Sequence, residues 1–458
     1  MQLAALCTDP FVLSCILLCL LLHLALCRSP NHRSSRLPPG PLGVSILGAT
    51  PLEVNCIKPP LLGDGFMQFT LPFVCPAPHT GLAALARKYG PVMYLRMGTC
   101  GVVLHLLGAC VRRDGAGRAL RGMAQAAEAG RPVVVPEVLV CALANIVGQI
   151  TVSRRYKEMI VSLLTGAGLF NISDFVLALS WLDLQGVHAR LRRVHRQFDG
   201  LITKLLAEHA ATAEERAREG RLDFVDRLRA SSGEDGETIT EVNIKGLIFD
   251  MFTAGTDTSS IIVEWAMAEM MNNPSIMASA QEEMDRVVGR DRRLEESDIA
   301  NLPYLQAICK EAMRLHPSTP LSLPHFSFEE CEEDGHHVPA NTRLLINIWA
   351  IGRDPAAWED PLEFRPERFL SGPAAKIDPM GNNFELIPFG AGRRICAGKL
   401  AGMVFVQYFL GMLVHSFEWR LPDGEEKVDM AETFGLALPK AIPLKAVVTR
   451  RLVPAAYA

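Results

Sequence analysis

The sequence predicts a mainly α-helical protein with small β-sheets, carried behind one N-terminal transmembrane helix. Three observations predict this class. An uncharged apolar run occupies residues 11–27, long segments after residue 133 repeat apolar residues at helical spacing, and extended segments are short. With 458 residues, 49% of them hydrophobic, the chain can bury a sizeable core.

The apolar run 11–27 predicts a membrane anchor within residues 1–27. A helix of this length rises about 25 Å, which is the lower limit for crossing a bilayer core. A cleaved signal peptide is the alternative, but it would begin with positive charge, whereas here Asp9 precedes the run. Because Arg28, Arg33 and Arg36 follow the run, we expect a single-pass membrane protein with its body in the cytosol.

The remaining elements follow in order. Residues 28–43 form a basic flank and a proline-rich hinge, and the body of the protein spans 44–458. Residues 51–78 match neither period and are assigned no element. The patterns further predict a strand pair at 88–106 and helices in the three regions 133–219, 240–272 and 303–317. Extended segments follow at 336–351, and a last helix of about 20 residues, 396–416, begins at Cys396.

Composition and motif absences exclude several classes of function. A net charge of −4 argues against a nucleic-acid partner. The 12 cysteines form no CxxC pair, which indicates a reducing compartment. The sequence contains no HExxH, GxSxG or P-loop motif, so the residues that begin the chemistry of a zinc protease, a serine hydrolase or an NTPase are missing.

The segment 388–398, PFGAGRRICAG, places one thiol in a tight and basic loop. Glycines 390, 392 and 398 let backbone N–H groups approach the sulfur of Cys396, and a following helix adds its positive end, so we expect a lowered thiol pKa and a thiolate metal ligand. Arg393 and Arg394 would then pair with anionic groups of a cofactor. A phosphate-binding loop or an inert cysteine in a turn remains open.

A second pattern is Glu311 with Arg314, which lie on one face of the helix 303–317. Arg368, in the segment FRPERF, could share the same carboxylate and staple the Cys396 loop to this helix. The alternative is an ordinary surface pair of little energetic weight.

A third pattern is AGTDT, residues 254–258, inside the long predicted helix. Ala254 and Gly255 would let a flat cofactor and dioxygen lie against the backbone, and Thr258 with Asp257 would relay protons. Close packing of this helix on a neighbour through small residues is the alternative.

Together these motifs resemble the cytochrome P450 superfamily of haem-thiolate monooxygenases. The frame F-x-x-G-x-R-x-C-x-G, the pair Glu311-x-x-Arg314, FRPERF and Ala254-Gly255-x-x-Thr258 occur in the family's order. The resemblance implies a cytochrome P450 fold in 44–458, haem b held by Cys396, and electrons from NADPH through a separate reductase. It also implies roles for individual residues: a structural triad of Glu311, Arg314 and Arg368, oxygen activation by Thr258 and Asp257, and haem contacts from Arg394, His325, Phe389, Gly392, Gly398, Ala254 and Gly255.

Longer matches resemble plant flavonoid 3',5'-hydroxylases, among them FTAGTDTSS and NNFELIPFGAGRRICAG. This resemblance implies O2-dependent hydroxylation of the flavonoid B ring, with Ala437, Leu436 and Leu321 as substrate contacts. The chain departs from the family at 51–78, which resembles an insertion, and at 104–132, where a substrate loop and a helix with W-x-x-x-R are missing. The alternative function is therefore a non-catalytic or decayed paralogue that binds haem weakly or acts only as a membrane-bound partner protein.

Overall fold

The computed structural model describes residues 46–47, 92–97, 100–105, 108–152, 186–218, 223–230, 239–333, 336–433 and 435–457. The predicted anchor, the hinge and the segment 51–78 lie outside the described residues, apart from strand β1 (Ile46–Leu47), which precedes that segment. The chain divides into two compact units. The smaller unit contains the segment 325–344, and the larger one contains the other described residues except Ile46.

The larger unit is mainly helical, as the sequence predicts. Its helices are α5 (Gly108–Glu128), α6 (Val135–Val152), α8 (Val187–Ala211), α9 (Ala213–Arg218), α10 (Phe224–Ala230), α11 (Glu241–Asn272), α12 (Pro274–Val287), α13 (Pro303–Leu315), α14 (Ile348–Ile351) and α15 (Lys399–Ser416). Short 3-10 helices are η4 (Glu296–Asn301), η5 (Pro366–Phe369), η6 (Pro373–Lys376), η7 (Gly392–Arg394) and η8 (Pro454–Tyr457).

Small antiparallel sheets accompany these helices. The predicted strand pair is confirmed as β2 (Val92–Met97) and β3 (Cys100–His105). A second sheet of the larger unit has the order β4-β10-β9, from Val133–Val134, Lys445–Arg450 and Phe417–Arg420.

In the smaller unit β6 (Cys331–Glu333) pairs with β7 (His336–Val338), so the two histidines 336 and 337 lie in a strand at the start of the predicted extended segment 336–351. There β5 (His325–Phe326) pairs with β8 (Arg343–Ile346), and β1 extends that sheet.

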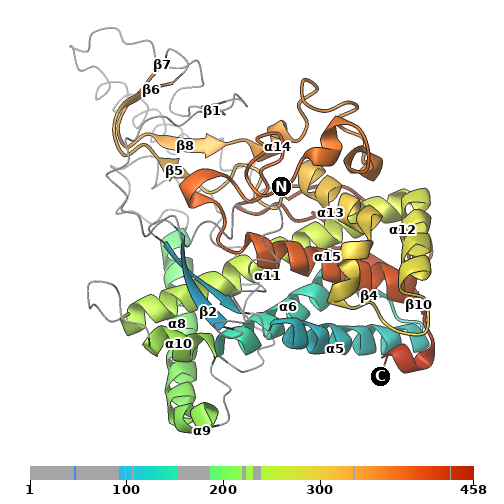
Figure 1. The fold of residues 1–458 in the computed structure, drawn as a ribbon, viewed down its shortest axis with the longest axis horizontal. Coiled ribbons are helices and arrows are strands. Elements are labelled where there is room, and N and C mark those ends of the chain that lie inside the picture. Colours follow the sequence, from blue (N-terminus) through green and yellow to red (C-terminus); the bar gives the residue numbers. More distant parts are fainter. Residues whose placement is uncertain are drawn as a thin grey trace, which may run out of the picture. The chain divides into compact units, whose positions relative to one another are not determined.

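Helix α11 runs through the core of the larger unit, between α6 and α15 (Figure 1). Its start and end match the prediction: Thr240 caps it in a reciprocal capping box with Asn243, and Pro274 opens the next helix. From Ser259 to Met270 nearly every side chain is buried, whereas Leu247, Asp250 and Ala254 are exposed and Thr258 is half-buried. Because these four residues recur at helical spacing, the N-terminal half of α11 presents one open stripe.

Helix α5 is an element that the sequence pattern did not reveal. Its apolar stripe is narrow, because only Ala116, Leu120, Met123 and Ala124 enter the core, and the rest of the helix is rich in glycine, alanine and arginine. A Cβ atom at Gly115 would stand 2.5 Å from Ile146 Cγ1 of α6. The glycine therefore allows α5 and α6 to pack closely. A conventional amphipathic helix would present a broader apolar face than α5 does.

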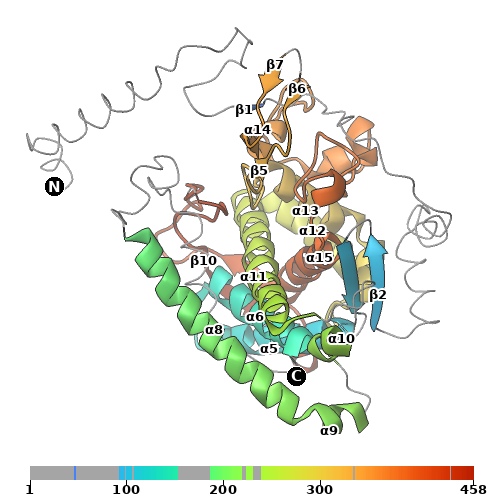
Figure 2. The same cartoon turned by 90° about the vertical axis from the view of Figure 1, so that its left-hand side faces the viewer.

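Helix α8 is one long element that ends at Ala211 with Thr212 as its C-cap, and the short α9 continues beyond it (Figure 2). One apolar cluster joins α8 and α10 to α6 and the first half of α11. Among the described residues, α15 alone is long and apolar enough to cross a membrane, but most of it is buried within the protein. We therefore identify α15 as a core helix.

Candidate active site

The loop before α15 is built around a short backbone hairpin. The Cys396 N–H donates to the Phe389 carbonyl oxygen over 2.9 Å. Gly390 and Gly392 adopt φ of 71° and 67°, a left-handed conformation that glycine enters at little cost. The Phe389 ring lies against Gly402 of α15, where an added Cβ would come within 3.2 Å of the ring. The glycines thus have two separate uses, which are to turn the loop and to seat the phenylalanine.

The thiol of Cys396 belongs to an exposed residue, two positions before the helix N-cap Gly398. The predicted helix start is therefore wrong by three residues, because α15 begins at Lys399. Desolvation by the surrounding chain raises the pKa of the Cys396 thiol, while the Gly398 N–H and the charge of Lys399 lower it. The net direction is upward, so the expected lowering by the loop alone is wrong. Deprotonation would be supplied by a metal ion, since a coordinating thiol loses its proton outright.

The predicted partners for anionic groups of the haem are Arg393, Arg394 and His325. Arg393 and Arg394 are exposed, and neither makes an ion pair with another described residue, so both are free to meet an anionic group. His325 opens strand β5 in the smaller unit and is half-buried.

Glu311 lies between two arginines, and all three side chains are buried, with 0%, 1% and 8% exposure for Glu311, Arg314 and Arg368. Arg314 donates to both carboxylate oxygens over 2.7 Å, and Arg368 Nε donates to one of them over 3.0 Å. The surface-pair alternative is therefore wrong.

The arginines also donate to backbone carbonyls of residues 352–363. The contact with the Cys396 loop is indirect: Trp358 and Phe369 pack on Leu386, shortly before that loop.

The AGTDT segment of α11 faces in two directions. A Cβ atom at Gly255 would stand 3.6 Å from Val147 Cγ2, so this glycine packs toward α6 as the small-residue alternative expects. Ala254 and Thr258 instead belong to the open stripe of α11. Thr258 Oγ1 donates to the Ala254 carbonyl over 2.7 Å.

Asp257 is the second member of the predicted proton relay. Burial raises the pKa of Asp257 to about 6. No hydrogen bond joins its carboxylate to Thr258 among the described atoms. A carboxyl group that titrates near neutral pH can both give and accept a proton under physiological conditions.

The predicted substrate contacts lie on adjacent segments of the larger unit. Leu436, Ala437 and Leu321 are all half-buried. The Leu438 N–H donates to the Ser318 carbonyl over 2.9 Å, which brings the segment around Ala437 beside the segment after α13.

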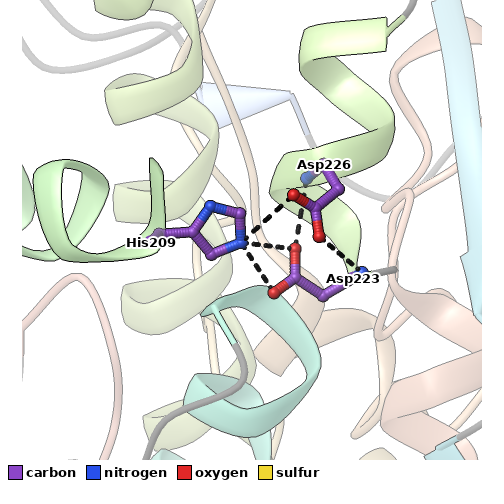
Figure 3. Close-up of side chains that lie close together, drawn as sticks. All are labelled: His209, Asp223 and Asp226. Carbon is purple, nitrogen blue, oxygen red and sulfur yellow. Dashed lines mark hydrogen bonds and ion pairs between the residues drawn. The ribbon is translucent and has the colours of Figure 1, made fainter. Parts of the chain in front are cut away.

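Sequence patterns missed a buried polar cluster of His209, Asp223 and Asp226 (Figure 3). Its three side chains could in principle surround a metal ion. Arg216, however, donates to His209 Nδ1 over 3.0 Å and to both oxygens of Asp226. Because arginine only donates, Nδ1 accepts, and the His209 proton sits on Nε2, which donates to Asp223 over 2.8 Å.

Arg216 therefore takes the place of a cation in this cluster. Burial acts to raise the pKa of Asp226, but the hydrogen bond and charge of Arg216, together with smaller effects of the Asp223 backbone N–H and His209, hold that pKa below its usual value. At the start of α10 the backbone N–H of Asp223 and that of Asp226 each donate to the carboxylate of the other residue. The cluster joins the end of α8 to α10, and no local sequence signal connects His209 with an acid pair 14 residues later.

Comparison with known proteins identifies the class of this site. Residues 111–444 match the family model for Cytochrome P450. The chain belongs to this family, and it is accordingly a monooxygenase of the haem-thiolate class, which uses haem and electrons from a redox partner.

Individual relatives narrow the similarity. The chain is 46% identical over 496 residues to Flavonoid 3',5'-hydroxylase of Eustoma exaltatum subsp. russellianum, covering 92% of this chain and 93% of the relative. It is 48% identical over 454 residues to Flavonoid 3',5'-hydroxylase 2 of Petunia hybrida, with 83% and 89% covered. It is 36% identical to Flavonoid 3'-monooxygenase of Arabidopsis thaliana, with 97% and 98% covered.

The residues of the Cys396 loop fit a haem. An exposed thiol, a Gly398 N–H directed to the sulfur and two exposed arginines without an ion pair to any described residue are a suitable donor set for an iron ion in a dianionic porphyrin with propionates. On the open stripe of α11, Ala254 presents only a methyl group, which leaves room for a flat ring at that position.

Proposed function

We propose that this chain is a membrane-anchored hydroxylase of the flavonoid B ring, of the 3',5' type. The similarity to flavonoid 3',5'-hydroxylases over more than nine-tenths of both chains carries this proposal. The proposed organisation is an anchor at 1–27, a basic and proline-rich hinge at 28–43, and a monooxygenase domain at 44–458. The anchor would hold the domain on the cytosolic face of the endoplasmic reticulum, where NADPH-cytochrome P450 reductase supplies electrons.

The proposed roles of the residues follow from their positions. Cys396 Sγ holds the iron, with the Gly398 N–H stabilising its negative charge, and Arg394 and His325 pair with the propionates. Haem bound through a thiolate supplies activation of O2, because sulfur pushes electron density toward iron and favours O–O cleavage. Glu311, Arg314 and Arg368 hold the chain before the loop. Thr258 and Asp257 hold and move the protons that this reaction consumes, and Ala437, Leu436 and Leu321 contact the flavonoid.

A second candidate function is a paralogue that has lost activity. Its support is the short connection between the first strands and α6, because only 28 residues lie between Leu104 and Val133 and no W-x-x-x-R occurs among them. The alignment over 496 residues is longer than this chain of 458, so the relative contains residues without a counterpart here. Without that helix one propionate contact is lost, and haem affinity should fall because an anionic group stays less compensated.

One experiment separates the two candidates. Full-length chain in microsomes, with the reductase and NADPH, is given a 4'-hydroxyflavanone and its products are separated by mass. Hydroxylated product supports the proposed function. A chain that retains haem but forms no product refutes the proposed function. A chain that loses haem, and regains it when a W-x-x-x-R segment is grafted in, supports the decayed paralogue.

A further inference from the structure

The segment 428–444 folds back on itself as a loop. The Thr433 N–H donates to the Pro439 carbonyl over 3.0 Å, and the Ala441 N–H donates to the Ala431 carbonyl over 2.7 Å. These bonds close the loop below its tip, which contains Leu436 and Ala437. The positions of these two side chains therefore depend on what holds the loop.

Helix α11 holds this loop at three points. At its end, Asn272 exchanges two hydrogen bonds with the backbone of Val428, over 3.1 and 2.9 Å. About two turns before Asn272, Trp265 Nε1 donates to the Leu438 carbonyl over 2.9 Å, and the Leu444 N–H donates to Glu264 over 2.8 Å. The bond at Leu438 lies one residue from Ala437.

The indole of Trp265 also contacts two polar side chains that belong to the segments it joins. The His316 ring, just after α13, stacks on it with centroids 4.2 Å apart and planes inclined by 2°. Lys440 Nζ lies 4.7 Å from the centre of the indole ring. Such a cation over a tryptophan face gains electrostatic energy, which is larger when water is excluded.

The four side chains are deeply buried, with 3% exposure for Glu264, 0% for Trp265, 6% for His316 and 5% for Lys440. His316 Nε2 bonds to Glu269 over 2.7 Å, and Glu432 of the loop lies 3.8 Å from His316 Nδ1. Apolar residues of similar size would pack this region at lower desolvation cost. What the polar set adds is direction, since the hydrogen bonds of Trp265 and Glu264 each fix one backbone atom of the loop.

We propose that Glu264, Trp265, His316 and Lys440 form a loop anchor that positions Leu436 and Ala437 and so decides which carbon of the substrate ring is hydroxylated. The four are positioning residues, since they act through the loop and not on the substrate. This inference rests on the proposed function for its chemical consequence, but the anchoring itself can be measured on the chain alone.

The first test compares two tryptophans that make the same kind of bond. Trp265→Phe keeps an aromatic ring beside His316 but loses the indole N–H together with the five-membered ring that carries it. Trp419→Phe is the matched control, because Trp419 Nε1 donates to the Leu413 carbonyl over 3.1 Å, outside the loop. Hydrogen exchange of peptides covering 428–444 should become about five-fold faster in Trp265→Phe, as expected for one lost hydrogen bond of about 1 kcal/mol, and stay unchanged in Trp419→Phe. Equal exchange in all three proteins overturns the anchor.

The second test separates hydrogen bonding from packing at Glu264. Glu264→Gln keeps an oxygen acceptor for the Leu444 N–H and should exchange like the wild type, whereas Glu264→Leu should accelerate exchange at the loop. Glu283→Gln is the control, because that buried carboxylate accepts the N–H groups of Tyr304 and Leu305 at the start of α13. Equal acceleration by Gln and Leu at position 264 overturns the hydrogen-bond role.

The third test measures the consequence for the reaction. With a 4'-hydroxyflavanone, Trp265→Phe should raise KM about two- to ten-fold and shift the ratio of singly to doubly hydroxylated product, while the carbon monoxide spectrum keeps its wild-type amplitude. Trp419→Phe should change neither. An unchanged KM and product ratio in Trp265→Phe contradict the proposal. If the wild-type chain makes no product, the proposed function fails, and the exchange data still decide whether the anchor exists.

Discussion

The substitution Glu311→Gln tests what the buried triad contributes to stability. In the native chain the carboxylate accepts two bonds from Arg314, one from Arg368 and one from the Arg365 N–H over 2.8 Å. An amide of the same shape has one acceptor oxygen and a group that donates, so the paired bonds with Arg314 are lost. Two guanidinium groups are then left buried without an anion.

Breaking a buried ion pair by removing one partner costs about 3–5 kcal/mol. We expect about 3 kcal/mol here, at the lower end, because both arginines keep their bonds to backbone carbonyls of residues 352–363. Urea unfolding of the full chain in detergent, followed by tryptophan fluorescence, measures this difference. Trp358 is a suitable reporter because its ring lies 5.2 Å from the Arg314 guanidinium.

The control variant is Asp423→Asn. Asp423 pairs with Arg420 at the same three-residue spacing, but both side chains are exposed. We expect no measurable change from it, since exposed pairs contribute little. If Glu311→Gln costs no more than Asp423→Asn, the triad does not stabilise this fold and the reasoning from burial is refuted.

Three further predictions concern the Cys396 loop and helix α11. Gly392→Ala and Gly130→Ala both place an alanine at positive φ with no neighbour within 4 Å, so each should lose about 1 kcal/mol on urea unfolding, while only Gly392→Ala should release haem in a haem-transfer assay. Burial raises the pKa of Glu264 from 4.5 to about 7, so the native state keeps the Glu264 proton over a pH range in which the unfolded state loses it. The free energy of unfolding should therefore fall as the pH rises from about 4.5 to 7. Glu264→Gln should remove about 3 kcal/mol of that fall, because an amide does not titrate. Asp257→Asn should lower product per NADPH consumed, because a group that titrates near pH 6 is lost from the proposed proton path; product yield equal to the wild type would exclude Asp257 from it.

Much of the fold could be predicted because its long helices carry clear signals. The boundaries of α11 and α13 follow from a capping threonine and from prolines at the first helical position. Helix α5 escaped prediction because close packing on α6 replaced a broad apolar face with Gly115 and small residues. The start of α15 was misplaced because the apolar pattern does not show that residues 392–394 form a separate 3-10 turn.

The site could be predicted only as far as its motifs are local. The spacing of Glu311 and Arg314 predicts a shared helix face, but their complete burial depends on residues 352–369, which no local pattern places there. The pKa of Cys396 was predicted in the wrong direction, because the loop's dipoles are visible in the sequence and the surrounding desolvation is not. The loop anchor is invisible in the sequence, since 173 residues separate Trp265 from Leu438.

The most direct measurement of the proposed chemistry is the absorption spectrum of the reduced chain under carbon monoxide. Thiolate ligation by Cys396 predicts a red-shifted Soret band in the wild-type protein and its loss in Cys396→Ser at equal haem content. A wild-type chain that retains haem without that shift, or a serine variant with the same spectrum, would contradict ligation by this residue.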